Sequence, residues 1–205
     1  MKTREHIKEV ACELFNQRGL ATVTLRDVAQ AMNRAYGNIT YHFPNKETIV
    51  LELYADMVSG LRGVSQQFDP NENLLKSILL APRQTFALSL KYLFLFKDYL
   101  EIMRHYPTIA EAAQQSNELR KQGLKKVFYA LQEQGLLRPE LDDAQLDYLM
   151  ELSGVMRTFF FVQLKTTDYQ SPTLESEYMA FVNRLLHPYL TAKGQAQYLE
   201  VLYKW

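Results

Sequence analysis

Residues 24–46, TLRDVAQAMNRAYGNITYHFPNK, contain the signals that decide the fold of the N-terminal part of this chain. Thr24 is a favourable N-cap residue, and Asp27 completes a capping box with it ahead of apolar residues at helical spacing, namely Leu25, Val28, Ala29 and Met32. A helix is therefore expected to begin at Leu25. Asn33 tolerates the left-handed conformation in which helices end, and Ile39 and Phe43 then resume helical spacing. The stretch predicts two short helices joined by a tight turn.

This pair of helices has the composition of a helix-turn-helix. Ala29 is a small residue at the point where the second helix would cross the first. The second helix, near residues 36–43, would then be free to enter a major groove of DNA.

The residues after the turn resemble the TetR family of bacterial transcriptional regulators, whose N-terminal region ends in a pattern similar to G-x-L-Y-x-H-F-x-x-K. The corresponding residues here are Gly37-Asn38-Ile39-Thr40-Tyr41-His42-Phe43-Pro44-Asn45-Lys46. The preceding helix is similar to that family at Ala11, Leu14, Phe15 and the Arg18-Gly19 end. The resemblance implies an all-α protein, with a three-helix helix-turn-helix DNA-binding domain in residues 1–46 and a larger helical ligand-binding and dimerisation domain in residues 47–205.

Three positions depart from the family pattern. Asn33 stands where the family usually has Gly, and it can adopt the same backbone conformation at a modest cost. Arg34 replaces a residue that is usually buried, so either its stem lies along the helix pair or the turn packs differently. Thr40 replaces a Tyr that commonly contacts a DNA phosphate, so Thr40 makes a shorter contact or Tyr41 takes over the role.

The resemblance implies a homodimeric regulator, a repressor that a small-molecule effector releases from a palindromic operator. Residues at the start of the second helix are expected at base edges, namely Tyr36, Gly37 and Asn38. Others are expected to bind phosphates, namely Thr24, Thr40, Tyr41, His42 and Lys46. Arg26 could do either. Phe43 is expected to pack between helices, and for Tyr41 packing is the alternative to a DNA contact.

Composition excludes several other classes of protein. A chain of 205 residues with 47% hydrophobic content can form one or two compact domains. Charges in the first ten residues argue against a signal peptide, and Lys91, Lys97 and Arg157 interrupt the longest apolar segments, so we expect a cytoplasmic protein without a membrane span. The single cysteine, Cys12, excludes an internal disulfide and is expected to be a small buried packing residue.

The net charge is zero, which argues against indiscriminate coating of nucleic acid. Residues 1–50 nevertheless contain seven basic and five acidic residues, and the remainder contains sixteen basic and eighteen acidic ones. This weak asymmetry places positive charge on the segment with the helix-turn-helix pattern.

The rest of the chain has apolar residues at three-and-four spacing throughout, which predicts an all-helical protein. Helices are expected near residues 3–18, 25–32, 36–43, 45–66, 73–98, 108–134, 142–166 and 174–190. Pro82 should kink or split the fifth of these, and residues 99–105 could form a separate short helix. The tail from Lys193 to Trp205 has helical spacing and could dock as a last turn or two.

The two helices after Pro139 suggest a partner surface. Residues 142–166 have two apolar stripes, of which one can serve the domain's own core, and the small pair Ser153-Gly154 would let two helices approach closely. With the resemblance, this predicts a four-helix bundle between two copies, with these interface residues: Leu146, Met150, Ser153, Phe160, Tyr178, Phe181, Val182, Leu185 and Tyr189. The alternative is a helix buried on all sides within the monomer.

The middle of the chain is unusually aromatic and could enclose the effector. The candidate pocket residues are Phe86, Tyr92, Phe96, Tyr99, Met103, His105, Phe128, Met156 and Phe159. Such walls would favour a flat or greasy small molecule over a sugar phosphate. The alternative is that these aromatic residues are ordinary core.

Metal and catalytic motifs are missing from the sequence. His6, His105 and His187 lack the spacing of metal ligands, so no metal or other cofactor is predicted. There is no G-x-S-x-G elbow, phosphate-binding glycine loop or H-E-x-x-H pair, so we do not expect an enzyme. The remaining alternatives are an activator or protein-responsive regulator of the same fold and, more remotely, a helical enzyme or adaptor.

Overall fold

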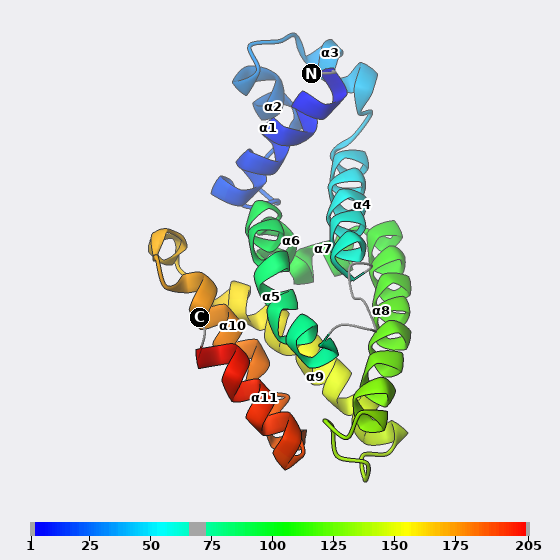
Figure 1. The fold of residues 1–205 in the computed structure, drawn as a ribbon. Coiled ribbons are helices and arrows are strands. Elements are labelled where there is room, and N and C mark those ends of the chain that lie inside the picture. Colours follow the sequence, from blue (N-terminus) through cyan, green and yellow to red (C-terminus); the bar gives the residue numbers. More distant parts are fainter. Residues whose placement is uncertain (1–2, 66–72, 204–205) are drawn as a thin grey trace. The chain divides into compact units, whose positions relative to one another are not determined.

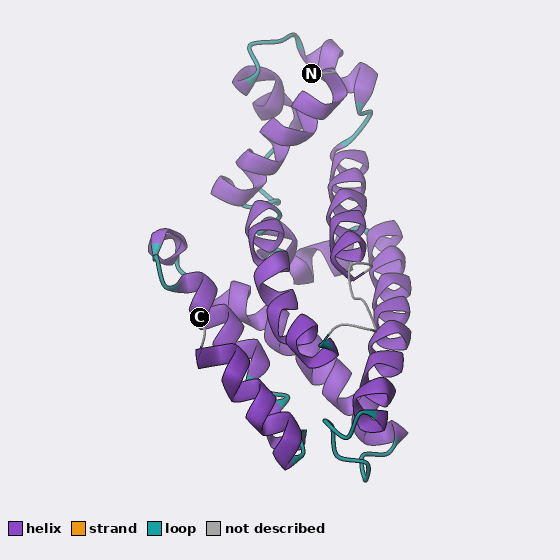
Figure 2. Cartoon of the chain, in the orientation of Figure 1, coloured by secondary structure: helices purple, strands orange, loops and turns teal. Residues whose placement is uncertain are grey.

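The computed structural model describes residues 3–65 and 73–203, and its regular elements there are helices (Figure 1, Figure 2). The predicted all-α class is therefore confirmed. The chain divides into two compact units: Met1–Leu61 with Leu88–Gln114, called the first unit, and Arg62–Ala87 with Gln115–Trp205, called the second unit. The boundary predicted at residue 46 does not coincide with the division between these units, and it stays a prediction.

Most of the expected helices are present, and the structure divides the remaining segments differently. Their bounds are α1 Thr3–Arg18, α2 Leu25–Ala31, α3 Tyr36–His42, α4 Lys46–Ser65, α5 Leu74–Lys91, α6 Phe94–Lys97, α7 Tyr99–His105, α8 Pro107–Glu133, α9 Asp143–Gln163, α10 Leu174–Asn183 and α11 Ala192–Tyr203, with short 3-10 helices at Thr166–Gln170 and His187–Tyr189. The bounds of α1 to α4, α8 and α9 agree with the prediction to within three residues at each end.

The fifth helix ends earlier than predicted, at Lys91 instead of residue 98. The side chain of Asn16, on α1, occupies the break: its Nδ2 donates to the Lys91 carbonyl at 2.8 Å and its Oδ1 accepts from the Phe94 amide at 2.8 Å. These bonds satisfy backbone groups that a continuous helix would have paired internally. The separate short helix expected at residues 99–105 is present as α7.

Pro82 does not split α5, which runs unbroken from Leu74 to Lys91. Proline lacks the amide hydrogen that the preceding turn would otherwise receive. Close to this gap, the buried Asn183 side chain of α10 donates from Nδ2 to the Leu79 carbonyl at 2.8 Å. A hydrogen bond between two helices of the second unit thus supports the backbone beside the proline.

The C-terminal segment also differs from the prediction. The helix expected over residues 174–190 ends at Asn183, and Pro188 lies in the turn that follows. The tail forms the three-turn helix α11, longer than the turn or two expected. Thr191 begins it, because its Oγ1 accepts from the Gly194 amide at 3.1 Å. Gly194 lies so close to the Leu136 carbonyl that an added Cβ would be 2.1 Å from its oxygen.

The core of the first unit joins the three N-terminal helices to parts of α4, α6 and α7. Its fully buried large side chains are Ile7, Phe15, Leu20, Ile39, Phe43, Ile49, Phe94 and Ile102. Cys12 is buried here as predicted, and burial raises the pKa of its thiol to about 12. Phe43 packs between helices as predicted. The three N-terminal helices therefore share one core with residues from the middle of the chain.

The core of the second unit contains much of the predicted dimer interface, which is a correction. Leu146, Met150, Phe160, Tyr178 and Val182 are buried inside the chain's own second unit. The other four members, Ser153, Phe181, Leu185 and Tyr189, are partly buried. The more regular of the two apolar stripes of α9 faces its own core because that face contacts α10 within the same unit.

The small pair in α9 has a different role from the one expected. The bare Cα of Gly154 lies against Arg120 of α8, since an added Cβ would be 2.9 Å from the Nη2 atom of that arginine. Gly154 therefore accommodates a side chain of its own chain. The close approach of two copies at this glycine stays a prediction.

Candidate DNA-binding surface

Helix α2 begins with the capping box that the sequence predicted. The Asp27 amide donates to Thr24 Oγ1 at 3.3 Å, and the Thr24 amide donates to the Asp27 carboxylate at 2.7 Å. Hydrogen bonds from the Thr24 side chain and backbone hold the pKa of Asp27 below its ordinary value. The Thr24 side chain thus caps its own helix, and it also remains exposed at the surface.

The turn between α2 and α3 is a Schellman motif with Asn33 in the left-handed position. Asn33 has φ 49°, its amide donates to Gln30 O at 3.0 Å, and the Arg34 amide donates to Ala29 O at 2.9 Å. This is the double hydrogen-bond pattern of that motif. Asn33 therefore does the work of the usual glycine. Arg34 is exposed, so of the two possibilities raised by the sequence the structure favours a turn that leaves this side chain in solvent.

Helix α3 exposes nearly all of its side chains. Ile39 is its buried residue, and Phe43 at its C-terminal cap is also buried. The predicted base-contacting residues, Tyr36, Gly37 and Asn38, are all exposed. Tyr41 is 82% exposed, so the packing alternative for this residue is wrong. A helix that leaves a tyrosine ring in water at such a position presents a surface suited to a partner molecule.

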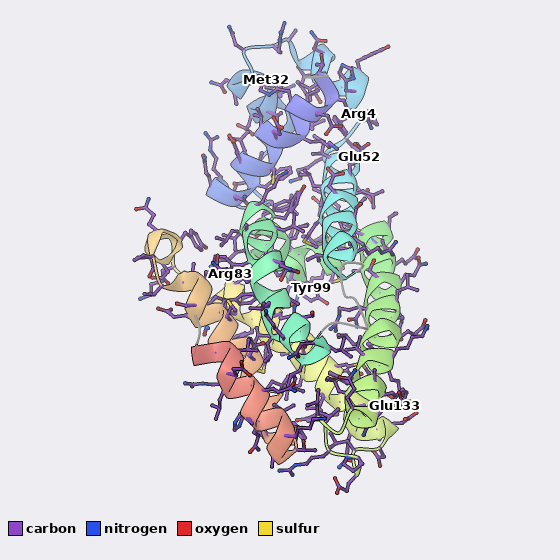
Figure 3. All side chains as sticks on the ribbon, viewed as in Figure 1. Arg4, Met32, Glu52, Arg83, Tyr99 and Glu133 are labelled. Atoms are coloured by element: carbon purple, nitrogen blue, oxygen red, sulfur yellow. The ribbon has the colours of Figure 1, made fainter. Side chains whose placement is uncertain are left out.

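Arg4 fixes the end of α3 to two other helices of the first unit. Its guanidinium pairs with Glu52 of α4, donates to the His42 carbonyl at 2.5 Å, and lies 4.2 Å from the centre of the Phe43 ring. Figure 3 labels Arg4 and Glu52, whose side chains come from α1 and α4. Hydrogen bonding to Glu52 raises the pKa of Arg4. Arg4 is therefore committed to positioning α3.

Lys46 is placed differently from the prediction. Its Nζ donates to the carbonyls of Leu20 and Val23 at 2.7 and 3.1 Å, in the loop between α1 and α2. Burial lowers the pKa of this lysine, and the nearby Glu101 and Asp98 oppose that shift. The side chain holds the loop instead of projecting toward solvent. We therefore withdraw Lys46 from the set of phosphate contacts.

Two arginines remain to supply positive charge beside α3. Arg26 on α2 is exposed and its guanidinium lies 5.6 Å from the centre of the Tyr36 ring, which orients both side chains. Arg34 is exposed in the turn immediately before α3. Arg34 was not among the DNA contacts expected from the sequence, although its charge next to α3 was the available signal. His42 and Thr40 are partly exposed, and Thr40 Oγ1 bonds back to the Gly37 carbonyl at 3.3 Å.

The predicted pocket residues do not form one cluster within either unit. Tyr92, Phe96, Tyr99, Met103 and His105 belong to the first unit, whereas Phe86, Phe128, Met156 and Phe159 belong to the second. Tyr92 is buried in the first core, and Phe86 and Phe128 are buried in the second unit, as the core alternative expected. Tyr99 and Phe159 are exposed. These nine residues therefore do not line a single cavity within one unit.

Two family models match this chain, one at each end. Residues 7–53 match the model described as bacterial regulatory proteins of the tetR family, and residues 62–198 match the C-terminal model described as a bacterial transcriptional repressor. The chain belongs to the TetR family. The first match spans the TetR-family helix-turn-helix and the start of α4, in agreement with the resemblance found in residues 24–46.

Curated relatives support the same assignment to the TetR family. The probable acrEF/envCD operon repressor of Escherichia coli K12 is 30% identical over 164 residues, which are 73% of this chain and 70% of that one. The HTH-type transcriptional repressor KstR2 of Mycobacterium tuberculosis is 24% identical over 144 residues, covering 68% and 71% of the two chains.

Solved structures show the same fold. A TetR-family transcriptional regulator from Marinobacter aquaeolei VT8 matches with a TM-score of 0.86 and 20% identity, over 100% of this chain and 98% of that one. The ketosteroid transcriptional regulator KstR2 of Mycobacterium tuberculosis matches with a TM-score of 0.70 and 19% identity, over 93% and 97%.

The TetR-family protein described here is a DNA-binding transcriptional regulator of the repressor type. Regulators of this family bind operator DNA and dimerise. In residues 3–65 and 73–203, no helix combines the length and the apolar character needed to cross a membrane.

Proposed function

We propose that two copies of this chain bind a palindromic operator through α3 and that a small-molecule effector bound in the second unit releases them. The exposure of Tyr36, Gly37, Asn38 and Tyr41 on α3 is the observation that supports this most strongly. Two such helices held about one turn of DNA apart, roughly 34–36 Å, would occupy successive major grooves. The role is one of binding, with no chemical step, and it would be performed in the cytoplasm, where operator DNA lies.

The contacts within each half-site are proposed to divide by position along the helix-turn-helix. Tyr36, Gly37 and Asn38 would lie at base edges, with the Asn38 amide suited to bidentate pairing with adenine. Side chains around them would bind phosphates, namely Thr24, Thr40, Tyr41, His42 and, in place of Lys46, Arg34. Arg26 would serve either role, steadied by the Tyr36 ring.

Selection of bound sequences from random DNA, followed by gel-shift titration, tests this assignment. Asn38→Ala should relax the preference at one base position by about 1–3 kcal/mol, whereas Arg34→Ala should weaken all sequences alike. A protein that selects no sequence, or whose binding does not weaken as salt rises, would refute operator recognition. A reporter gene under the selected site then distinguishes repression from activation.

The second apolar stripe of α9 is the surface that we propose for dimerisation. Val155 and Phe159 are 63% and 53% exposed, one turn apart, and Val162 and Tyr148 continue the exposed apolar stripe in either direction. Burial of such a stripe against its copy would remove apolar surface from water along much of the helix. This is the face of α9 that the sequence left outside the first stripe.

Sedimentation velocity on two variants tests this surface. Phe159→Glu should convert the dimer to a monomer, because a charge at the centre of an apolar interface is desolvated without a partner. Leu100→Glu, at an exposed apolar residue of α7, is the matched control and should leave the dimer intact. Dissociation by both variants or by neither would contradict the proposed interface.

Effector release is proposed to work by a population shift between two conformations. Effector and operator should then weaken each other's binding by the same factor. Isothermal titration that gives one effector affinity with and without operator would refute this coupling.

A further inference from the structure

Two arginine side chains of the second unit, one from α8 and one from α9, lie near enough for their charges to interact. The Arg120 guanidinium lies against α9, where Nη2 donates to the Met150 carbonyl at 3.2 Å and to Asn117 Oδ1 at 3.0 Å. Gly154 provides the space for it, as described above. Arg157 follows Gly154 by three positions, so both lie on the same face of α9. The positive charge of Arg157 acts on Arg120.

Arg157 is joined to two further helices by hydroxyl groups. Tyr178 of α10 is 1% exposed, and its side chain hydrogen-bonds with those of Arg157 and of Thr85 on α5. The Nε atom of Arg157 is buried and has no hydrogen-bond partner in the described structure. Four helices of one unit therefore bring together two guanidinium groups, a phenol and an alcohol, with one charged N–H donor unused.

The arginine pair lacks the acidic partners that neighbouring cations have. On the same two helices, Lys121 lies 2.9 Å from Glu151 and Lys125 lies 3.0 Å from Asp143. In the part of the chain that the structure describes, no carboxylate lies within ion-pair distance of Arg120 or Arg157. Arginine cannot lose its proton to relieve the repulsion. Burial, together with the charge of Arg157, lowers the pKa of Arg120.

Aromatic rings adjoin this group of donors. The rings of Phe160 and Phe161 have their centres 5.0 Å from that of Tyr178, and the ring of Phe86 has its centre 5.6 Å away. An apolar wall thus adjoins Tyr178, the hydrogen-bond partner of Arg157. A ligand that matched both would have an anionic group attached to an apolar body.

We propose that the effector is an organic acid with an apolar body, whose carboxylate binds between Arg120 and Arg157 while its body lies against the aromatic rings. This rests on the effector role proposed above and adds the chemical class of the ligand. A carboxylate is planar and accepts two parallel hydrogen bonds from a guanidinium, so it matches the unused Arg157 donor better than a neutral group would. Tyr178 and Thr85 hold Arg157 in place and act as positioning residues.

Thermal unfolding of the full chain with defined probes tests the class of ligand. Decanoate and naphthoate are the carboxylates, and decanol and naphthalene methanol are neutral counterparts with the same bodies. The carboxylates should raise Tm in a saturable manner and the alcohols should not. Equal shifts by acid and alcohol, or no shift by either, would overturn the proposal.

Substitutions then locate the site. Arg120→Met and Arg157→Met should each weaken carboxylate binding by about 10- to 100-fold, whereas Lys121→Met, which removes a paired cation from the same helix, should leave it unchanged. Arg157→Lys keeps the charge but not the fork and should weaken binding about tenfold. Without ligand, Arg157→Met should have a Tm no lower than the parent, because one of two like charges is gone. A lower Tm with unchanged carboxylate binding would show that Arg157 is purely structural.

Operator binding separates this proposal from the function on which it rests. If carboxylates bind through the arginines but leave operator affinity unchanged, the anion site stands and the effector role fails. If only neutral molecules release the operator and the arginine variants respond normally, the effector role stands and the anion site is refuted.

Discussion

Lys46→Met should destabilise the protein while leaving the salt dependence of operator binding unchanged. The Lys46 ammonium group donates hydrogen bonds to the carbonyls of Leu20 and Val23 at 2.7 and 3.1 Å, and those two residues are buried. Methionine keeps an unbranched apolar stem but removes the donors, so both carbonyls lose a charged partner. If Lys46 instead bound a DNA phosphate, the substitution would weaken operator binding and leave the stability of the fold unchanged.

The magnitude follows from these two bonds. A hydrogen bond to a charged group contributes about 1.5–3 kcal/mol, and a neutral one about 1 kcal/mol. Here one ammonium serves both carbonyls, and burial lowers the pKa of Lys46, so methionine recovers a desolvation cost that offsets part of the loss. We expect a net loss of about 2 kcal/mol in the free energy of unfolding. For a chain of this length that corresponds to a fall in Tm of roughly 4–8 °C.

Far-UV circular dichroism measures the Tm, and gel-shift titration between about 50 and 200 mM salt measures the slope of operator affinity. Arg34→Met is the matched control, because this arginine is exposed beside α3. It should change Tm by less than about 2 °C and lower the salt slope by about 1. If Lys46→Met instead keeps the parent Tm and lowers the slope by about 1, the assignment of Lys46 to the loop is refuted.

Three further substitutions test local features of the fold. In urea denaturation, Asn33→Val should lower the free energy of unfolding by about 1–2 kcal/mol, because a β-branched residue resists φ 49°. Asn33→Gly should change it by less than about 0.5 kcal/mol. Equal stability of both variants would contradict the assigned turn. Gly194→Ala should lower the free energy of unfolding by about 1–3 kcal/mol or more, because the new Cβ would clash with a backbone carbonyl. Gly123→Ala, whose Cβ would meet no neighbour, should raise it by about 0.5–1 kcal/mol. A Gly194→Ala variant as stable as the parent would disprove the close approach of α11. An NMR titration should give the Asp27 carboxylate a pKa below 3.8. The contribution of this carboxylate to stability is then present above pH 3.8 and is lost as the pH falls through the lowered pKa. Asp27→Asn should abolish this pH dependence, and a pKa at or above 3.8 would contradict the capping box.

The sequence by itself determined the features whose causes lie within a few residues of each other. The Thr24–Asp27 capping box set the start of α2, and the tolerance of Asn33 for positive φ set the turn. The four-residue spacing of Ile39 and Phe43 identified the inward face of α3, which in turn exposed the residues expected to contact DNA. These signals are local because capping, turn conformation and helical periodicity all act within about one helical turn.

Only the tertiary structure decided the features that depend on distant partners. The end of α5 depends on Asn16, which lies more than seventy residues earlier and supplies hydrogen bonds at both sides of the break. Lys46 binds the Leu20 and Val23 carbonyls, which lie within its reach only once the first unit has folded.

The roles of the two stripes of α9 and of its arginine also depend on distant partners. Periodicity located both stripes, but their roles depended on which one packed against α10, and that contact buried Met150 and left Phe159 in solvent. Arg157 has no distinguishing pattern in the sequence, and it becomes informative only beside Arg120 and away from carboxylates. Local sequence determines which conformations the backbone prefers, whereas long-range packing decides which polar groups find partners and which remain available for a ligand.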